Sequence, residues 1–204
     1  YHRKDEPYKQ QVKSINLRIP YIKQLMLRVI HIVFSIMISI SVTHAQDEIQ
    51  WLTWEEMQVM QKREARKVLI DVYTDWCGWC KRMDKNTFQK ADIARYVNNN
   101  YYAVKFDAEY KDDIIFNGLK YSYVKSGRKG HHELAELILK GRLSFPTVVF
   151  LDEGLKVIQP IPGYQDSRSM ELIVTYFARD YYKDTPWKKY TTMYNSNMIQ
   201  DAGF

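Results

Sequence analysis

The chain contains two cysteines, Cys77 and Cys80, within the sequence Trp-Cys-Gly-Trp-Cys-Lys over 76–81. Two thiols at this spacing can close a disulfide with each other, so the pair can store two electrons. The apolar run directly before them predicts a buried strand, and a helix is then expected to begin at Cys77. The unpaired N–H groups of a helix N-terminus favour a thiolate, which lowers the pKa of a cysteine placed there. The pattern therefore predicts thiol–disulfide exchange, with Cys77 as an exposed nucleophile and Cys80 as the resolving thiol.

One carboxylate interrupts the apolar run before the cysteines. Asp71 lies six residues before Cys77, inside the segment 68–73, which is rich in strand-forming residues. Burial in a dry strand raises the pKa of a carboxyl group, and this suits a general acid or base. The alternative is an aspartate that faces solvent at the edge of a sheet.

The elements that must position these residues alternate between helices and strands, which favours an α/β sandwich. Thr53 and Glu56 form a capping box for the first helix, and the pair Asn117-Gly118 between strand-like flanks indicates a tight hairpin. Helices are predicted over 53–67, 77–90, 91–98, 131–139 and 166–182, and strands over 68–73, 101–107, 147–151 and 156–161. The segment 183–204 shows no clear period, so an irregular tail is expected there.

Two segments together resemble the thioredoxin superfamily. Residues 68–81 are similar to the strand and active-site segment of that family, and Phe145-Pro146-Thr147 with the apolar run behind it is similar to the family's cis-proline loop. The resemblance covers roughly residues 50–182. It is greatest to exported thioredoxin-like proteins and to the C-terminal domain of membrane thiol:disulfide interchange proteins. It implies a thioredoxin fold, in which helices flank a central mixed sheet, with a β-hairpin region inserted around 108–130.

The resemblance also implies a role for individual residues. Asp71 resembles the family's buried aspartate, which relays protons to and from the resolving thiol. Pro146 resembles the cis proline, whose bond turns the backbone of Phe145 toward the active-site sulfur, where it can pair with an extended substrate. A trans proline at the start of an edge strand is the alternative. Lys105 stands where the family often has a lysine near the aspartate, and ion pairing there would oppose the rise in the pKa of Asp71.

The residues between the cysteines depart from the family's usual pattern. Gly78-Trp79 stands where typical thioredoxins have Gly-Pro, and this pair influences the reduction potential, so the direction of electron flow stays open. Trp76 is expected to cover the disulfide as an apolar wall. The substrate-binding residues are therefore predicted to be Trp76, Gly78, Trp79, Phe145 and Pro146.

A metal site is the alternative use of the two cysteines. Two thiolates are half of a tetrahedral zinc site, and the adjacent His131 and His132 are the candidates for the other ligands. Histidines near a helix start are more often solvated than ligating. The sequence therefore predicts no metal, and no cofactor beyond the redox-active disulfide.

The aromatic residues of the 108–130 insertion alternate with lysine and aspartate, as on a hairpin that faces solvent. A surface extension is the first interpretation of this pattern. A lip over Cys77 that selects the substrate is the second.

The first 45 residues have the composition of a targeting segment. They hold seven Lys/Arg against two Asp/Glu, whereas the remaining residues hold 23 against 22, so the near-neutral body does not favour nucleic acid as a partner. Residues 29–42 are uncharged and mostly apolar, and 43–45 offer small residues before a cleavage point. We therefore predict an upstream extension over 1–25, a signal peptide over 26–45, a thioredoxin-like domain over 46–182 and a tail over 183–204. An uncleaved anchor formed by 26–45 is the alternative.

These observations predict an exported, periplasmic thiol–disulfide oxidoreductase that reduces or exchanges disulfides in partner proteins and acts as a monomer. An upstream donor, for which a membrane thiol:disulfide interchange protein is the candidate, would supply its electrons. The alternative is a non-catalytic thioredoxin-fold module that binds a partner or uses the cysteine pair to hold a metal.

Overall fold

The structure is a computed structural model that describes residues 24, 26–31, 48–127 and 129–196. The chain divides into two units, 1–45 and 46–204. In the first unit, residues 26–31 are helical, and most of the predicted upstream extension and signal peptide lie outside the described residues. Within the described part of the chain, no helix has the length and apolarity needed to cross a bilayer.

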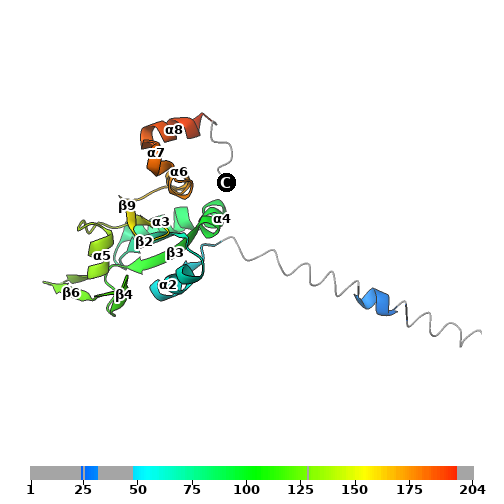
Figure 1. Cartoon of the computed structure of the whole chain (residues 1–204), viewed down its shortest axis with the longest axis horizontal. Coiled ribbons are helices and arrows are strands. Elements are labelled where there is room, and N and C mark those ends of the chain that lie inside the picture. The colour runs from blue at the N-terminus through cyan, green and yellow to red at the C-terminus, as the bar shows by residue number, and fades with distance from the viewer. Residues whose placement is uncertain (1–23, 25, 32–47, 128, 197–204) are drawn as a thin grey trace, which may run out of the picture. The chain divides into compact units, whose positions relative to one another are not determined.

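A mixed sheet of five strands lies at the centre of the second unit (Figure 1). Across the sheet the order is β1 (Trp51–Leu52), β3 (Tyr101–Asp107), β2 (Lys67–Tyr73), β8 (Thr147–Leu151) and β9 (Val157–Pro162). The first three strands are parallel, whereas β8 runs antiparallel to β2 and β9 antiparallel to β8. The structure confirms the predicted strands, with bounds that differ by one residue at most.

Helices cover both faces of this sheet. One buried cluster joins it to α4 (Ala91–Asn100), α6 (Ser167–Ala178) and α8 (Trp187–Asn195). A second cluster joins it to α2 (Trp54–Arg63) and α5 (Glu133–Ile138). Strand β2 contributes Leu69 to the first cluster and Ile70 to the second, because successive side chains of a strand point to opposite faces. The capping box at Thr53, which starts α2, is present as predicted.

The helix predicted over 77–90 is shorter and changes its form. It is α3 (Gly78–Met83), followed by η1 (Asp84–Phe88), a stretch of π-helix. Such stretches are rare in proteins, and those that occur often lie at functional sites. Met83 and Phe88 from these two elements are buried in the first cluster, so packing against the sheet fixes the active-site helix.

The prediction of an irregular tail over 183–204 is wrong for its first half. After the short α7 (Tyr181–Asp184), α8 forms a helix whose Tyr190 and Tyr194 are buried in the first cluster. The two tyrosines are four residues apart and therefore lie on one face of the helix. The Tyr190 hydroxyl donates a hydrogen bond to the Leu172 carbonyl at 3.0 Å, which ties α8 to α6.

The inserted region forms two hairpins. The first pairs β4 (Ile114–Phe116) with β5 (Leu119–Tyr121), and the second pairs β6 (Tyr123–Ser126) with β7 (Lys129–His132). Asn117 and Gly118 have φ of 50° and 78°, the left-handed backbone that a two-residue hairpin requires, so the hairpin predicted at this pair is confirmed. The expectation of a wholly solvent-facing hairpin is wrong for β4, because Phe116 is buried with its ring 5.2 Å from that of Trp54.

The predicted start of a helix at His131 is wrong by two residues. His131 and His132 belong to β7, where they pair with Val124 and Tyr123, and α5 begins at Glu133. His132 is buried and caps α5, since its Nδ1 accepts the N–H of Leu134 at 3.1 Å. A histidine that was expected to be solvated therefore has a structural role.

Candidate active site

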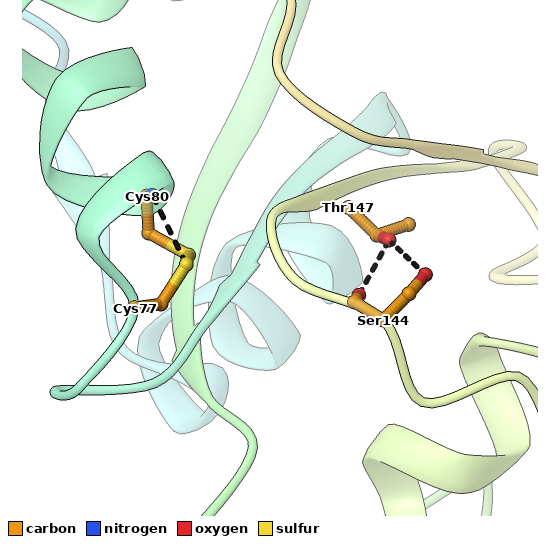
Figure 2. Close-up of a disulfide and its surroundings, with 4 residues drawn as sticks. All are labelled: Cys77, Cys80, Ser144 and Thr147. Atoms are coloured by element: carbon orange, nitrogen blue, oxygen red, sulfur yellow. Dashed lines mark hydrogen bonds between the residues drawn. A yellow bond between two sulfur atoms is a disulfide. The ribbon is translucent and has the colours of Figure 1, made fainter.

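The two cysteines form a disulfide at the start of α3 (Figure 2). The segment that follows β2 ends in a turn. In this turn the Cys77 N–H donates a hydrogen bond to the Thr74 carbonyl at 3.0 Å. Cys77 is then the N-cap residue of α3, and its Sγ accepts the N–H of Cys80 at 3.0 Å. The prediction of a helix that begins at Cys77 is confirmed, and a helix N–H points at this sulfur, where it favours a thiolate.

The expected exposure of the Cys77 sulfur is not found in this oxidised form. Cys77 is 6% exposed and Cys80 is 5% exposed. The cap hydrogen bond and the disulfide hold the Cys77 sulfur against the first turn of the helix, which explains its burial. An attacking thiolate must therefore approach along a restricted direction.

Asp71 lies on β2 beneath the active-site helix. It is 1% exposed, and its Oδ1 has no hydrogen-bond partner among the described residues. Burial raises the pKa of Asp71 to about 7, while Lys105 opposes the rise and Asp84 adds to it. The structure confirms the predicted burial and the predicted direction of the pKa shift. A carboxyl group with this pKa can both give and take a proton near neutral pH.

Lys105 lies beside Asp71 in the parallel register of β2 and β3, but it forms its ion pair with another carboxylate. Its ammonium contacts Asp84, the first residue after α3. Asp71, Cys80, Asp84 and Lys105 line one cavity of about 160 Å³. Asp84 was not predicted from the sequence, although its position four residues after Cys80 places the two on the same face of a helix.

The loop before β8 faces the disulfide (Figure 2). Its Phe145–Pro146 peptide bond is cis, as the resemblance implies. Two hydrogen bonds hold the loop, from the Thr147 hydroxyl to the Ser144 carbonyl at 2.7 Å and from the Gly163 N–H to the Pro146 carbonyl at 2.8 Å. Among the hydrogen bonds between described residues, none uses the backbone N–H or carbonyl of Phe145. These two groups are therefore available to an extended chain.

The two tryptophans of the motif lie in different surroundings. Each is 56% exposed. The ring of Trp76 meets that of Phe145 edge to face at 6.0 Å, and its Nε1 donates to the Glu109 carboxylate at 3.1 Å. Trp79 packs against Tyr164, with ring centroids 5.6 Å apart. The structure thus brings Trp76 and Phe145 together and places the Trp79 ring against a different loop. Gly78 between the cysteines is exposed, with open space where a side chain would stand.

The two histidines considered as metal ligands are engaged elsewhere. His131 contacts the Glu136 carboxylate at 2.9 Å, and both ring nitrogens of His132 have backbone partners, the Leu134 N–H and the Asp112 carbonyl. Burial lowers the pKa of His132. Among the described residues, no three His, Cys, Asp or Glu side chains are grouped as metal ligands would be.

The sheet order, the helices on both faces, the cis proline and the Cys77–Cys80 disulfide define a thioredoxin-fold protein with a Cys-x-x-Cys active-site motif. The family described as Thioredox_DsbH, a protein of unknown function (DUF255), matches residues 39–157. This match covers more than half of the chain, and the chain belongs to that family.

Curated proteins and solved structures also match parts of this chain. Spermatogenesis-associated protein 20 from Mus musculus is 31% identical over 72 residues, 35% of this chain and 9% of that protein. A thioredoxin-fold protein from Helicobacter pylori is 21% identical, with 65% of this chain and 81% of that chain covered and a TM-score of 0.49. The DsbH oxidoreductase is 17% identical, with 61% and 82% covered and a TM-score of 0.40. The chain spans about a tenth of the length of the curated relatives it matches.

Proposed function

We propose that this protein is a thiol–disulfide oxidoreductase that reduces disulfides in partner proteins. The observation that carries the proposal is the position of the Cys77–Cys80 disulfide, at a helix N-terminus and beside a buried carboxyl group whose pKa is raised to about 7. An inert disulfide has no use for a buried, unpaired aspartate, whose burial costs stability. A redox-active disulfide uses it to move a proton.

In the proposed reaction the reduced protein passes two electrons to its substrate. The Cys77 thiolate attacks one sulfur of a substrate disulfide, which forms a mixed disulfide and releases the first substrate thiolate, protonated by solvent. Asp71 takes the proton of the Cys80 thiol through the cavity that both residues line. The Cys80 thiolate then attacks the Cys77 sulfur, which forms the observed disulfide and releases the second substrate sulfur as a thiolate, which takes up the proton that Asp71 gives back. An external dithiol reduces the protein again.

The loop before β8 is suited to hold the substrate during this exchange. No described residue pairs with the backbone groups of Phe145, and the loop faces the sulfurs (Figure 2). An extended segment of the substrate that pairs with Phe145 would bring its own disulfide to Cys77. This use of the backbone needs no particular substrate sequence, so it suits a range of partner proteins.

Insulin reduction tests the proposal. The full-length chain is incubated with insulin and dithiothreitol as the external dithiol, and precipitation of the freed B chain is followed against a Cys77→Ser control. The protein is expected to accelerate the reaction, and the control to return it to the rate with dithiothreitol alone. Equal rates for protein and control would overturn the proposal. Equilibration of the Cys77–Cys80 pair with glutathione buffers gives its reduction potential, and a strongly oxidising value would exclude the direction of flow proposed here.

We also propose that the protein is exported and receives electrons from a membrane thiol:disulfide interchange protein. The support is the sequence over 26–45, with its basic start, apolar run and small residues before a cleavage point. Expression of the full chain followed by fractionation and N-terminal sequencing tests the export. Recovery outside the cytoplasm with a new N-terminus at Gln46 is expected, and recovery in the cytoplasm at full length would contradict it.

A further inference from the structure

A groove of about 370 Å³ lies beside the active site, between two walls that are distant in the sequence. Trp76 and Phe145 line it on the side of the active site. Each directly precedes a functional residue, Cys77 and the cis Pro146. The β6–β7 hairpin provides the other wall with Ser126, Lys129 and His131 and the intervening Gly130. The groove thus extends from the position at which a substrate backbone would pair into the inserted region.

The hairpin wall is held firmly in place. The His132 N–H donates to the Ala108 carbonyl at 2.7 Å, and the Glu133 N–H donates to the Ser122 carbonyl at 3.0 Å. A Cβ atom at residue 130 would lie 2.3 Å from the Tyr123 hydroxyl, so only glycine allows this close packing across the hairpin. The hydrogen bond to Ala108 ties the base of this wall to the residue that follows β3.

Three ionisable side chains line the groove, and two of them have partners. The Glu109 carboxylate accepts the Trp76 Nε1–H, and His131 contacts the carboxylate of Glu136. Lys129 is exposed and forms no ion pair with any described residue; its ammonium lies 4.2 Å from the centroid of the Trp76 ring. The hairpin itself, residues 123–132, contains no Asp or Glu. Among its described lining residues, the groove therefore offers one cation without a carboxylate partner, beside an exposed aromatic surface.

We propose that this groove binds an extended segment of the substrate protein that carries an acidic side chain close to the cysteine under attack. The carboxylate would pair with Lys129, and an apolar part of the same segment would cover Trp76 and Phe145. The inference rests on the proposed function for the position of the substrate cysteine at Cys77. The inserted hairpin is then the wall of the active site that selects the substrate. From the sequence alone, this insertion had two interpretations, a surface extension or a lip over Cys77.

Lys125 provides a matched control on the same hairpin. In the register of β6 and β7, Lys125 pairs with Gly130 and Ser126 with Lys129, so Lys125 and Lys129 point to opposite faces. Both are exposed lysines near the tip, and Lys125 does not line the groove. The variants Lys129→Glu and Lys125→Glu therefore make the same change of net charge and differ in the face that they alter.

Two pairs of synthetic peptides test the inference with the full-length chain. The first pair contains a disulfide, and one peptide carries two Glu and the other two Lys next to the first cysteine. The second pair is identical except that Ser replaces each Cys. Reduction of the first pair gives kcat/KM, and quenching of tryptophan fluorescence gives the affinity for the second. We expect kcat/KM and affinity to be about two- to five-fold higher for the acidic peptides than for the basic ones, which corresponds to the free energy of an exposed ion pair. This preference should be smaller at high salt.

Lys129→Glu is expected to reverse this preference, and Lys125→Glu to leave it within the error of the wild-type ratio. Equal affinity of the wild type for the two serine peptides, or an unchanged preference in Lys129→Glu, would overturn the inference. Failure of the wild type to reduce either disulfide peptide would instead contradict the proposed function. The serine peptides decide the inference in that case too, because their binding involves no redox step.

Discussion

Two regions beside the active-site motif differ in size and chemistry. On the inner side, Asp71, Asp84 and Lys105 share a cavity of about 160 Å³ with Cys80. On the outer side, Trp76, Phe145 and the β6–β7 hairpin line a groove of about 370 Å³. Asp and Lys side chains line most of the inner cavity together with Cys80, whereas the groove has exposed aromatic rings and a lysine that forms no ion pair with any described residue.

The comparison indicates that mutation can separate the two functions proposed for this motif, proton transfer and substrate binding. In the proposed reaction, residues on the inner side control when a proton leaves Cys80, so changes there should alter the rate of chemistry and its pH dependence. In the same proposal, residues on the outer side contact the substrate protein, so changes there should alter KM and leave the rate at saturation nearly unchanged. The predictions below test this division, beginning with the largest expected effect.

Cys80→Ser should give the largest loss. Without the resolving thiol, the mixed disulfide on Cys77 has no internal way to break, so steady-state reduction of insulin should fall on the order of 10³-fold or more. The mixed disulfide should accumulate and be visible by non-reducing electrophoresis and mass spectrometry. Cys77→Ser is the control, since it should lose the same activity and trap nothing. Accumulation in Cys77→Ser in place of Cys80→Ser would exchange the two roles.

Asp71→Asn should slow the reaction on the order of 10²-fold at pH 8, because it removes the general base that takes the proton of Cys80. The loss should lie in kcat, with KM unchanged, as expected for a residue on the inner side. Measurements of both constants with a disulfide peptide decide this. A variant that changed KM alone would contradict the proposed role and the separation of the two regions.

The same variant should make the folded protein more stable at alkaline pH. Because burial raises the pKa of Asp71 to about 7 in the folded state, the folded protein binds more protons than the unfolded chain between about pH 4 and pH 7. The contribution of Asp71 to stability is therefore fully present below pH 4 and is lost as the pH rises through 7. Urea unfolding of the oxidised proteins should show Asp71→Asn gaining up to about 4 kcal/mol over the wild type at pH 8 and little at pH 4.

The inner side was largely predictable from the sequence because its parts are local. The strand 68–73, the cysteine pair and Asp71 stand within fourteen residues of each other, and alternation along a strand fixes which face each side chain takes. The ion pair between Lys105 and Asp84 was not predictable in this way. Asp84 was available as a signal four residues after Cys80, but its partner Lys105 is on β3, and the two meet only where η1 packs beside this strand.

The outer side was less predictable because it depends on packing between distant segments. The sequence indicated a hairpin at Asn117-Gly118, and the structure adds a second one, β6–β7, whose connection begins with Gly127 at φ of 60° in place of an Asn-Gly pair. Nothing in the sequence of the hairpin relates Lys129 to Trp76, which lies 53 residues earlier. The helix α8 was missed for a similar reason, since the spacing of Tyr190 and Tyr194 becomes informative only against the buried face of α6.

Trp76→Ala should separate the two tryptophans of the motif. Loss of an exposed aromatic ring that lines the groove should raise KM for a disulfide peptide about tenfold, with kcat within twofold of the wild type. Trp79→Ala is the matched control, because Trp79 is equally exposed at 56% and packs on Tyr164 instead. It should change KM less than threefold. Equal effects of the two changes would show that both rings contact the substrate, as the sequence alone predicted.

Asp84→Asn should give the smallest effect and test the inner side most finely. The Asp84 carboxylate adds to the rise in the pKa of Asp71, and it also holds the Lys105 ammonium in an ion pair. Its removal should lower the pKa of Asp71 for both reasons. More Asp71 is then ionised at pH 6, so the ratio of kcat at pH 6 to kcat at pH 8 should rise about two- to three-fold.

Lys105→Gln gives the opposite sign from the same cavity. It removes the cation that opposes the rise in the pKa of Asp71, so the ratio of kcat at pH 6 to kcat at pH 8 should fall. Opposite shifts in two variants that lose the same ion pair cannot come from a general loss of structure, because a structural effect would move both profiles in one direction. Shifts of the same sign would mean that the pair acts through the position of η1 rather than through charge at Asp71.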